Sequence, residues 1–404
     1  MANPASGIKK LIAYKVEATF GTAPGASGAQ YLRNVTSSLD LTKDTYQSNE
    51  KRGDMQIADF RHGVRRVAGA INGELSPKTY ADFFASAVRK DFAAVTAMTG
   101  LSVTIAGSGP TYTVARASGS FLTDGVKAGH VVRLSVGALN AANIAKNLLV
   151  VSLVAATLTV MPLNGVALVA EGPIATTTVT VTGKQTYVPA TGHTDKSYSI
   201  EHVFSDITQS ELFRGCKVSG IDVNLPPTGI ATVAVNFMGQ DITTATSAYF
   251  TTPTAITTTG VDAAVNGILL VGGTAVAIVT GLSIKLTTGL SGDPVVGSNV
   301  LPALYPGRVL VTGQITAYFA DAVLRDLFVN ETESSLVCAL SCDNTAASDF
   351  ITFVLPRIKV DGASKDDGEK GIVMTLPFQA LYNSAGGTGI SSEATTLLIQ
   401  DSQA

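Results

Sequence analysis

Two stretches of the sequence decide the fold, VAGAINGELSPKTYADFF at residues 67–84 and VTGQITAYFADAVLRDLF at residues 311–328. The second begins 244 residues after the first, and in both stretches apolar residues or glycines first alternate and then follow helical spacing. The matching positions are Val67 and Val311, Gly69 and Gly313, Ile71 and Ile315, Leu75 and Phe319, Tyr80 and Leu324, Phe83 and Leu327, and Phe84 and Phe328. The sequence therefore predicts the same strand and helix twice, and with them an internal duplication.

These two helices are the only helical segments that the sequence indicates. The first begins near Pro77, a residue favoured in the first turn of a helix, and the second spans residues 320–329. The residues expected on the buried faces are Tyr80, Phe83, Phe84 and Val88 in the first helix, and Leu324, Leu327 and Phe328 in the second. Elsewhere, short alternating runs rich in Thr, Val, Ala and Gly are separated by turn residues, which predicts a mainly β protein.

The repeat resumes beyond the helix at a smaller offset of 137 residues, which aligns residues 197–206 with residues 334–343. Further matches at this offset are Ile200 with Val337, Val203 with Leu340, Ile221 with Ile358, and Val223 with Val360. The decrease of 107 residues from the first offset indicates an insertion of about that size in the first copy. The inserted segment contains alternating runs of its own, which predict a small β-domain.

The expected architecture is two tandem β-sandwiches, each with one helix, and one inserted β-domain. The expected segments are an N-terminal arm at 1–30, the first sandwich at 31–98 and 191–243, the inserted domain at 99–190, a linker at 244–262, the second sandwich at 263–382, and a C-terminal arm at 383–404. An inserted domain connects through two neighbouring chain ends, so we expect it to project outward and to be dispensable for the parent fold.

The composition constrains the function. Of the 404 residues, 46% are hydrophobic and only 15% are charged, with a mean hydropathy of +0.30. A chain so poor in charge either enters a membrane or buries much of its surface against partners, because monomers rarely expose large apolar patches. The net charge of −3 provides no field that would attract nucleic acid or anionic lipid.

One segment is long enough to be considered for a membrane span. Residues Ala263–Ile284 include no charged side chain, and about 20 apolar residues span a bilayer as a helix. Glycines interrupt the segment, its β-branched residues favour strands, and Gly272–Gly273 is a hairpin signal. We therefore expect strands here. The N-terminus also lacks the apolar run of a signal peptide, because Lys15 and Glu17 interrupt it.

Long connections precede the repeated strand in both copies, at residues 42–62 and 287–306. Loops of this length are usually functional or disordered. The first contains charges of both signs, which suit pairing with another protein surface more than binding of a polyanion: Lys43, Asp44, Glu50, Lys51, Arg52, Asp54, Asp59 and Arg61. A plain solvated loop is the alternative. We expect the first connection to become ordered only on assembly.

The sequence contains no convincing catalytic, metal or cofactor site. Asp54, Asp59 and His62 lack the spacing of zinc ligands, and residues 361–370 place Ala and Lys where a calcium loop requires oxygen ligands. The basic run Arg61–Arg66 has no aromatic platform for nucleic acid, which favours a solvated or salt-bridged strand end. We expect a non-enzymatic protein without cofactors.

The cysteines Cys216, Cys338 and Cys342 are odd in number and form no CxxC motif. This pattern favours reduced thiols that pack as small apolar side chains.

Two regions resemble a known family. The opening IAYKVEATFGTAP at residues 12–24, followed by the 39–66 segment with YQSNEKRG at residues 46–53, resembles tail tube (major tail) proteins of long-tailed bacteriophages. The segment from GSFLTDG at residues 119–125 to VVRL at residues 131–134 is similar to an accessory β-domain inserted in some of them. The second half of the chain is connected to this resemblance through the internal repeat.

The resemblance implies a structural virion protein of the tail, assembled in the host cytoplasm. Proteins of this family fold as β-sandwiches with one helix, join side by side into rings, and stack the rings into a tube through which double-stranded DNA passes non-specifically. The implied partners are other copies of the chain and tail proteins such as the tape measure and terminator proteins, without membrane insertion. Burial of the ring faces would explain the low charge.

Two sandwiches per chain imply three chains where relatives with one sandwich form six-membered rings, and hence pseudo-hexameric trimers. The sequence leaves two other classes open. A multi-domain bacterial surface or adhesin-like protein would fit the composition but requires an export signal, and a β-sandwich hydrolase requires a set of His and carboxylate residues.

Overall fold

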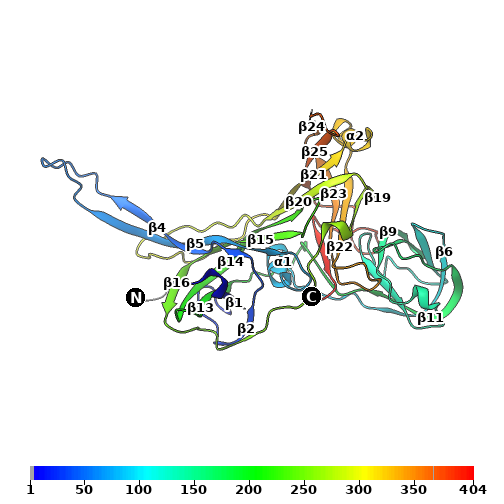
Figure 1. Ribbon diagram of the computed structural model, residues 1–404, viewed down its shortest axis with the longest axis horizontal. Helices are drawn as coiled ribbons and strands as arrows, with labels where there is room; N and C mark the ends of the chain where they lie inside the picture. Colours follow the sequence, from blue (N-terminus) through cyan, green and yellow to red (C-terminus); the bar gives the residue numbers. More distant parts are fainter. Residues whose placement is uncertain (1–3, 367) are drawn as a thin grey trace.

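A computed structural model describes residues 4–366 and 368–404 and shows an elongated, mainly β protein (Figure 1). A central body contains both halves of the chain, a closed barrel lies at one end, and a long two-stranded arm extends from the other. Within the described residues the α-helices are α1 (Ala81–Val88) and α2 (Val323–Val329), at the two positions that the sequence predicts. The mainly β fold class is therefore confirmed.

The first half of the chain forms two sheets that share one long strand, β14. The strands of the first half are β1 (Lys10–Val16), β2 (Ser27–Tyr31), β3 (Thr36–Ser37), β4 (Asp40–Gln47), β5 (Phe60–Glu74), β12 (Lys184–Tyr187), β13 (Tyr198–Phe204), β14 (Gln209–Leu225), β15 (Thr232–Gly239), β16 (Asp241–Ala245) and β17 (Thr252–Thr254). The beginning of β14 pairs with β13 and β16, and its end pairs with β15, which also pairs with β5. Strand β14 thus passes from one sheet to the other.

Helix α1 closes the core of the first half. The ring of Phe83 lies 4.8 Å from that of Tyr14 and 5.3 Å from those of Tyr198 and Phe237. All four residues predicted for the buried face of this helix are buried. In α2 the prediction is wrong for Phe328, which is 42% exposed, whereas Leu324 is buried and Leu327 is partly buried against the core. A helix of only seven residues presents too narrow a face to bury all three side chains.

A closed six-stranded barrel interrupts the first half. Its strands, which lie in the order β10-β7-β6-β11-β8-β9, are β6 (Met98–Ala106), β7 (Tyr112–Arg116), β8 (Val131–Ser135), β9 (Leu148–Val154), β10 (Thr157–Pro162) and β11 (Glu171–Val181). The barrel has an apolar core of its own, in which Phe121, Leu134 and Leu158 are fully buried. It begins one residue before the predicted inserted domain 99–190. Strand β12 lies within that predicted range but outside the barrel, since it pairs with β26 (Leu398–Asp401).

The second half pairs its strands in the same order as the first. Its strands are β18 (Gly267–Val271), β19 (Thr274–Ala275), β20 (Val279–Thr287), β21 (Leu310–Tyr318), β22 (Ser334–Ser341), β23 (Phe350–Val360), β24 (Ser364–Lys365), β25 (Val373–Ala380) and β26. Strand β23 pairs first with β22 and β26 and then with β25, which also pairs with β21. β23 therefore occupies the place that β14 has in the first half.

The segment considered for a membrane span forms strands, as predicted. Strands β18 and β19 are joined by a turn at Gly272 and Gly273, whose φ angles of 59° and 78° favour glycine. Among the described residues, no helix is long and apolar enough to cross a membrane.

The repeated glycines have the same physical role in the two halves. A Cβ atom at Gly69 would lie 2.3 Å from the carbonyl oxygen of Ser38, and one at Gly313 would lie 2.3 Å from that of Ser283. Both distances are far below a normal contact, so each glycine allows the preceding strand to approach closely. This explains why the pattern of β5 recurs in β21.

One antiparallel sheet runs through both halves and is called the joint sheet below. Its strand order is β4-β5-β15-β14-β20-β21-β25-β23. The central contact joins β14 of the first half to β20 of the second, and a continuous apolar core lies under both. The two sandwiches are thus fused edge to edge.

The strand pairings correct the predicted 137-residue offset. Ile200 pairs with Phe213, Leu336 pairs with Leu355, and all four side chains belong to the shared core, so β13 corresponds to β22 at an offset of 136. Val337, which the sequence aligned with Ile200, instead packs against the barrel. A slip of one residue exchanges the faces of a strand, and β22 is buried on both faces, so its alternation could not fix the register.

The predicted terminal arms and linker also need correction. Strand β1 lies within the predicted arm 1–30 but pairs with β13, and β26 lies within the predicted arm 383–404 but pairs with β12 and β23. Strand β17 lies in the predicted linker 244–262 and pairs with β2. These short strands belong to the sandwiches, because they complete sheets whose partners are distant in sequence.

Candidate functional site

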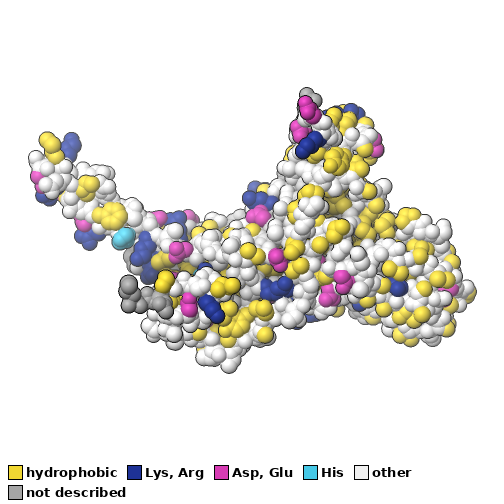
Figure 2. Space-filling model, in the orientation of Figure 1, with side chains coloured by type: hydrophobic (Ala, Val, Ile, Leu, Met, Phe, Trp, Pro, Cys, Tyr) yellow, Lys and Arg dark blue, Asp and Glu magenta, His cyan; other side chains and the backbone are white. Residues whose placement is uncertain are grey.

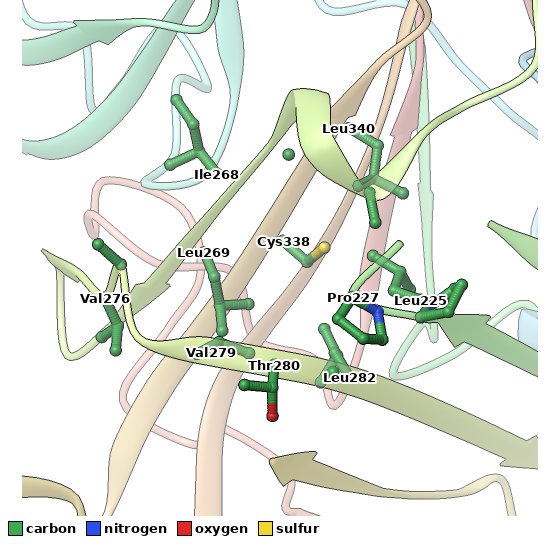
Figure 3. Close-up of a pocket in the computed structure, with 15 residues that line it drawn as sticks. Leu225, Pro227, Ile268, Leu269, Val276, Val279, Thr280, Leu282, Cys338 and Leu340 are labelled. Carbon is green, nitrogen blue, oxygen red and sulfur yellow. The ribbon is translucent and has the colours of Figure 1, made fainter. Parts of the chain in front are cut away.

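An apolar pocket lies between the end of β14 and strands β18, β20 and β22 (Figure 3). Leu225, Leu269, Leu282 and Leu340 contribute to its lining, and Cys338 is the only titratable residue among the described residues that line it. Burial raises the pKa of the Cys338 thiol to about 12, which keeps the thiol protonated and a poor nucleophile at neutral pH. The pocket therefore has the chemistry of a packing defect rather than of an active site.

The arm is the most exposed feature of the molecule (Figure 1). The predicted connection at 42–62 is shorter than expected, because β4 continues to Gln47 and β5 begins at Phe60. The hairpin is closed by a hydrogen bond from the Ser48 N–H to the Asp59 carbonyl. Both strands continue beyond the body through mainly polar residues, which a loop-length argument could not detect.

The predicted charged residues of the arm form local ion pairs. Arg52 lies 2.8 Å from Asp54, Arg61 lies 2.7 Å from Asp59, and Arg66 lies 3.2 Å from Asp44. The arginines at 52 and 61 lower the pKa of Asp54 and Asp59 through hydrogen bonds. The remaining candidates are Lys43 on β4 and Glu50 and Lys51 in the connection. These exposed pairs stabilise little and leave the arm free to contact another surface.

Sequence reasoning missed the apolar side chains of the arm. Met55 is 96% exposed, and Tyr46, Ile57 and Phe60 are exposed as well. Figure 2 shows apolar and charged side chains interspersed along the arm. The position of the apolar side chains inside a charged segment of the sequence is the signal from which they could have been predicted. Such a mixture favours a protein contact over a purely solvated hairpin.

The second long connection, residues 288–309, folds back onto the first half of the chain. Leu301 and Leu304 are buried in a cluster with Val64. The backbone N–H of Arg65 donates to the Asn299 carbonyl at 2.8 Å, and Lys217 Nζ donates to the Leu304 carbonyl at 2.9 Å. One long connection thus covers a neighbouring half, whereas the arm extends away from the body.

The joint sheet ends in two edges that have no further strand within the described residues. One edge is formed by β3 and β4, which pair only with β5. The other is formed by residues 361–366, which contact β25 on one side only. Exposed edges of this kind are templates for pairing with another chain.

The other sequence candidates show no site chemistry. Among the described positions, no group of three or more His, Cys, Asp or Glu side chains could hold a metal ion. In the basic run, Arg61 and Arg66 are salt-bridged as above, and Arg65 lies 2.8 Å from Asp241, as predicted for a salt-bridged strand end. The charged tip at 361–370 contains β24, with residue 367 outside the described residues.

Comparison with known proteins identifies the family. The sequence model of the family described as phage tail tube protein matches residues 7–380. The chain belongs to this family. A search of curated proteins finds no match. The match confirms the expected resemblance over nearly the whole chain, including the second half, which carries little recognisable motif. Tail tube proteins are structural components of the virion.

Proposed function

We propose that this tail tube protein assembles into rings of three copies, which stack to form a conduit that delivers DNA into the host. The observation that supports this most strongly is the joint sheet, which supplies eight strands and ends in two different open edges. Contacts between unlike edges are heterologous, so they generate a ring when the rotation closes. Closure would cover both edges.

Barrel geometry favours three copies over six. Three joint sheets contribute 24 strands, and with strands about 4.8 Å apart and tilted by about 40° the barrel has a backbone diameter of roughly 50 Å. Six copies would double this diameter. A ring of three is therefore wide enough for duplex DNA, whereas a ring of six would have a bore much wider than the duplex.

The face of the joint sheet that points away from the core suits a channel for DNA. It presents mainly small or uncharged polar side chains, among them Ala68, Ala70, Asn72, Ala234, Asn236, Asn224, Ser283, Thr312, Gln314, Thr316, Thr375 and Gln379. The acidic and basic residues on it are balanced, with Asp222 opposite Lys285, with Asp40, Arg66 and Glu74 on the first half, and with Lys359 on β23. A nearly neutral wall lacks the phosphate contacts that would retard DNA.

The arm and the barrel are proposed to lie outside this wall. The arm is proposed to contact the next copy or the next ring through its charged and apolar side chains. The barrel lies at the opposite end from the arm and is proposed to decorate the outer surface (Figure 1). Tape measure and terminator proteins are the proposed partners of the lumen and of the tube end. No enzymatic activity is part of this proposal.

Electron microscopy of the purified full-length chain tests the proposal. Tubes averaged without imposed symmetry are expected to show three outer knobs per ring, one for each barrel. Six knobs would show that each chain supplies one wall segment only. A chain that stays monomeric by sedimentation at high concentration would contradict the assembly itself.

A further inference from the structure

The two halves contain the same ion pair at corresponding positions. Lys217 Nζ lies 2.5 Å from Asp195, and Lys359 Nζ lies 2.9 Å from Glu331. The two lysines are 142 residues apart, whereas the two acids are 136 residues apart, the same offset that relates β13 to β22. Lys217 of β14 therefore corresponds to Lys359 of β23.

The irregularities of the sheet give the same correspondence. Val218 pairs with Phe237, and one extra residue follows on β14 before the pairing of Asp222 with Ala234. In the second half Val360 pairs with Phe378, and one extra residue precedes the pairing of Ser364 with Thr375. Asp222 thus corresponds to Ser364, and the edge 220–224 corresponds to the edge 362–366.

The strands that face these edges correspond as well. Leu286 of β20 pairs with Val311, and Leu41 of β4 pairs with Val67, the matching residue of the repeat. Lys285 therefore corresponds to Asp40. Within the chain, Lys285 lies opposite Asp222 in the contact between β14 and β20. The corresponding residues Asp40 and Ser364 lie at the two open ends of the joint sheet.

We propose that the contact between β14 and β20 is the template for the contact between copies. In this contact the β3–β4 edge of a second copy pairs antiparallel with residues 362–366, with Asp40 opposite Ser364, Leu41 opposite Ala363 and Ser38 opposite Asp366. The proposal rests on the ring proposed above and specifies its register. It commits both open edges to one partner, another copy of this chain.

The side chains suit this partner. Leu39 is buried in the core beside the open β4 edge, Leu41 is half-buried there, and Ala363 packs against the core at the other edge. Pairing would extend the core across the contact, as Ile221 and Leu286 do within the chain. Lys365 stands where the template has Val223, and a charge on an open edge discourages incorrect pairing before assembly.

The register can be tested with disulfides. The Thr288 N–H donates to the Ser219 carbonyl, which makes this a hydrogen-bonded pair and makes Asp222–Lys285 a non-hydrogen-bonded pair by alternation. Such a pair places the Cα atoms about 4.5 Å apart, within the range of a disulfide. The double variant D222C/K285C is therefore a control that should form a disulfide within one chain.

The test variant is D40C/S364C in the full-length chain, oxidised after assembly and analysed on non-reducing gels. We expect covalent dimers and trimers that disappear on reduction, and the same products from S38C/D366C. The single variants and the slipped pair D40C/D366C are expected to stay monomeric on the gel, because the native cysteines lie elsewhere.

The possible outcomes distinguish failure of the proposed register from failure of the proposed ring. Normal rings, an intrachain disulfide in D222C/K285C and no interchain product from either matched pair would overturn the register alone. Interchain product from D40C/D366C but not from the matched pairs would likewise overturn it. Wild-type protein that forms no rings would overturn the proposed function and, with it, the proposed contact.

Discussion

Lys217 Nζ lies 2.5 Å from the carboxylate of Asp195 and 2.9 Å from the carbonyl oxygen of Leu304. One nearly buried ammonium group thereby connects β14, the segment before β13 and the long connection of the second half. In the second half, Lys359 retains the corresponding acid, Glu331, and remains more exposed. The comparison shows that Lys217 has both of its hydrogen-bond partners, Asp195 and Leu304, within one chain.

Replacing Lys217 with Met should destabilise the chain by about 1–3 kcal/mol, because the buried Leu304 carbonyl loses its donor. Chemical denaturation measures the change in the free energy of unfolding. Lys196→Met is a matched control, because its partner Asp91 is largely exposed and this pair should contribute little. Equal effects of the two substitutions would contradict the role of Lys217.

Reversing both basic residues at the arm tip, Lys51→Glu with Arg52→Glu, should impair assembly and leave the fold intact. The reversal removes the pair between Arg52 and Asp54 and places like charges together on an exposed hairpin. Sedimentation reports assembly and circular dichroism reports the fold. Lys146→Glu on the barrel is the control, and tubes of normal length from the double variant would count against the arm as a contact.

The apolar residues of the arm allow a separate test. Met55→Ser with Ile57→Ser should reduce assembly at high salt, where screening weakens charge contacts and the apolar contribution dominates. The critical concentration for polymerisation is expected to rise several-fold. An unchanged critical concentration would show that these side chains remain in solvent in the assembled tube.

The sequence predicts the strand–helix repeat because Gly69 and Gly313 and the buried faces recur at one offset. It does not predict the register of β22, since both faces of that strand are buried. The charges of the arm indicate its position but not its length, because strand β5 continues through polar residues such as His62. The joint sheet depends on the contact of β14 with β20, and no local sequence pattern encodes that pairing.

Removal of the barrel should reduce solubility, contrary to the expectation that the insertion is dispensable. Val131 and Leu149 of the barrel pack against Val337, Phe350 and Val354 of the second half, and deletion would expose that surface. The appropriate deletion joins Ala97 to Thr182, because removing the whole predicted domain 99–190 would also remove β12 and its pairing with β26.

The deletion is best tested with and without Val337→Thr and Val354→Thr. We expect the deletion alone to aggregate and the deletion with both threonines to be more soluble and to form rings without knobs. A fully soluble deletion without the threonines would show that the contact of the barrel with the second half is not needed to protect that surface.

The last prediction concerns Asp262, which is fully buried between the two halves. Its N–H donates to the Leu75 carbonyl, and its carboxylate accepts a hydrogen bond from Cys342 at 3.4 Å, while the second carboxylate oxygen has no partner in the part of the chain that the structure describes. Burial raises the pKa of Asp262 to about 8, with smaller contributions from Asp401 and Asp349. The folded chain therefore holds a proton that the unfolded chain releases near pH 4.

Because the folded state binds the extra proton, this group makes the free energy of unfolding fall as pH rises from about 4 to about 8, by about 1.4 kcal/mol per pH unit. Asp262→Asn should remove this contribution, so its stability relative to the wild type should rise from pH 5 to pH 8. Denaturation midpoints of both proteins across this range provide the measurement. Burial lowers the pKa of His130 and His202 to about 3, which weakens the fold at low pH, but this effect is common to both proteins and cancels in the difference. A difference that does not change with pH would show that Asp262 is ionised in the folded chain throughout, with a partner for its second oxygen.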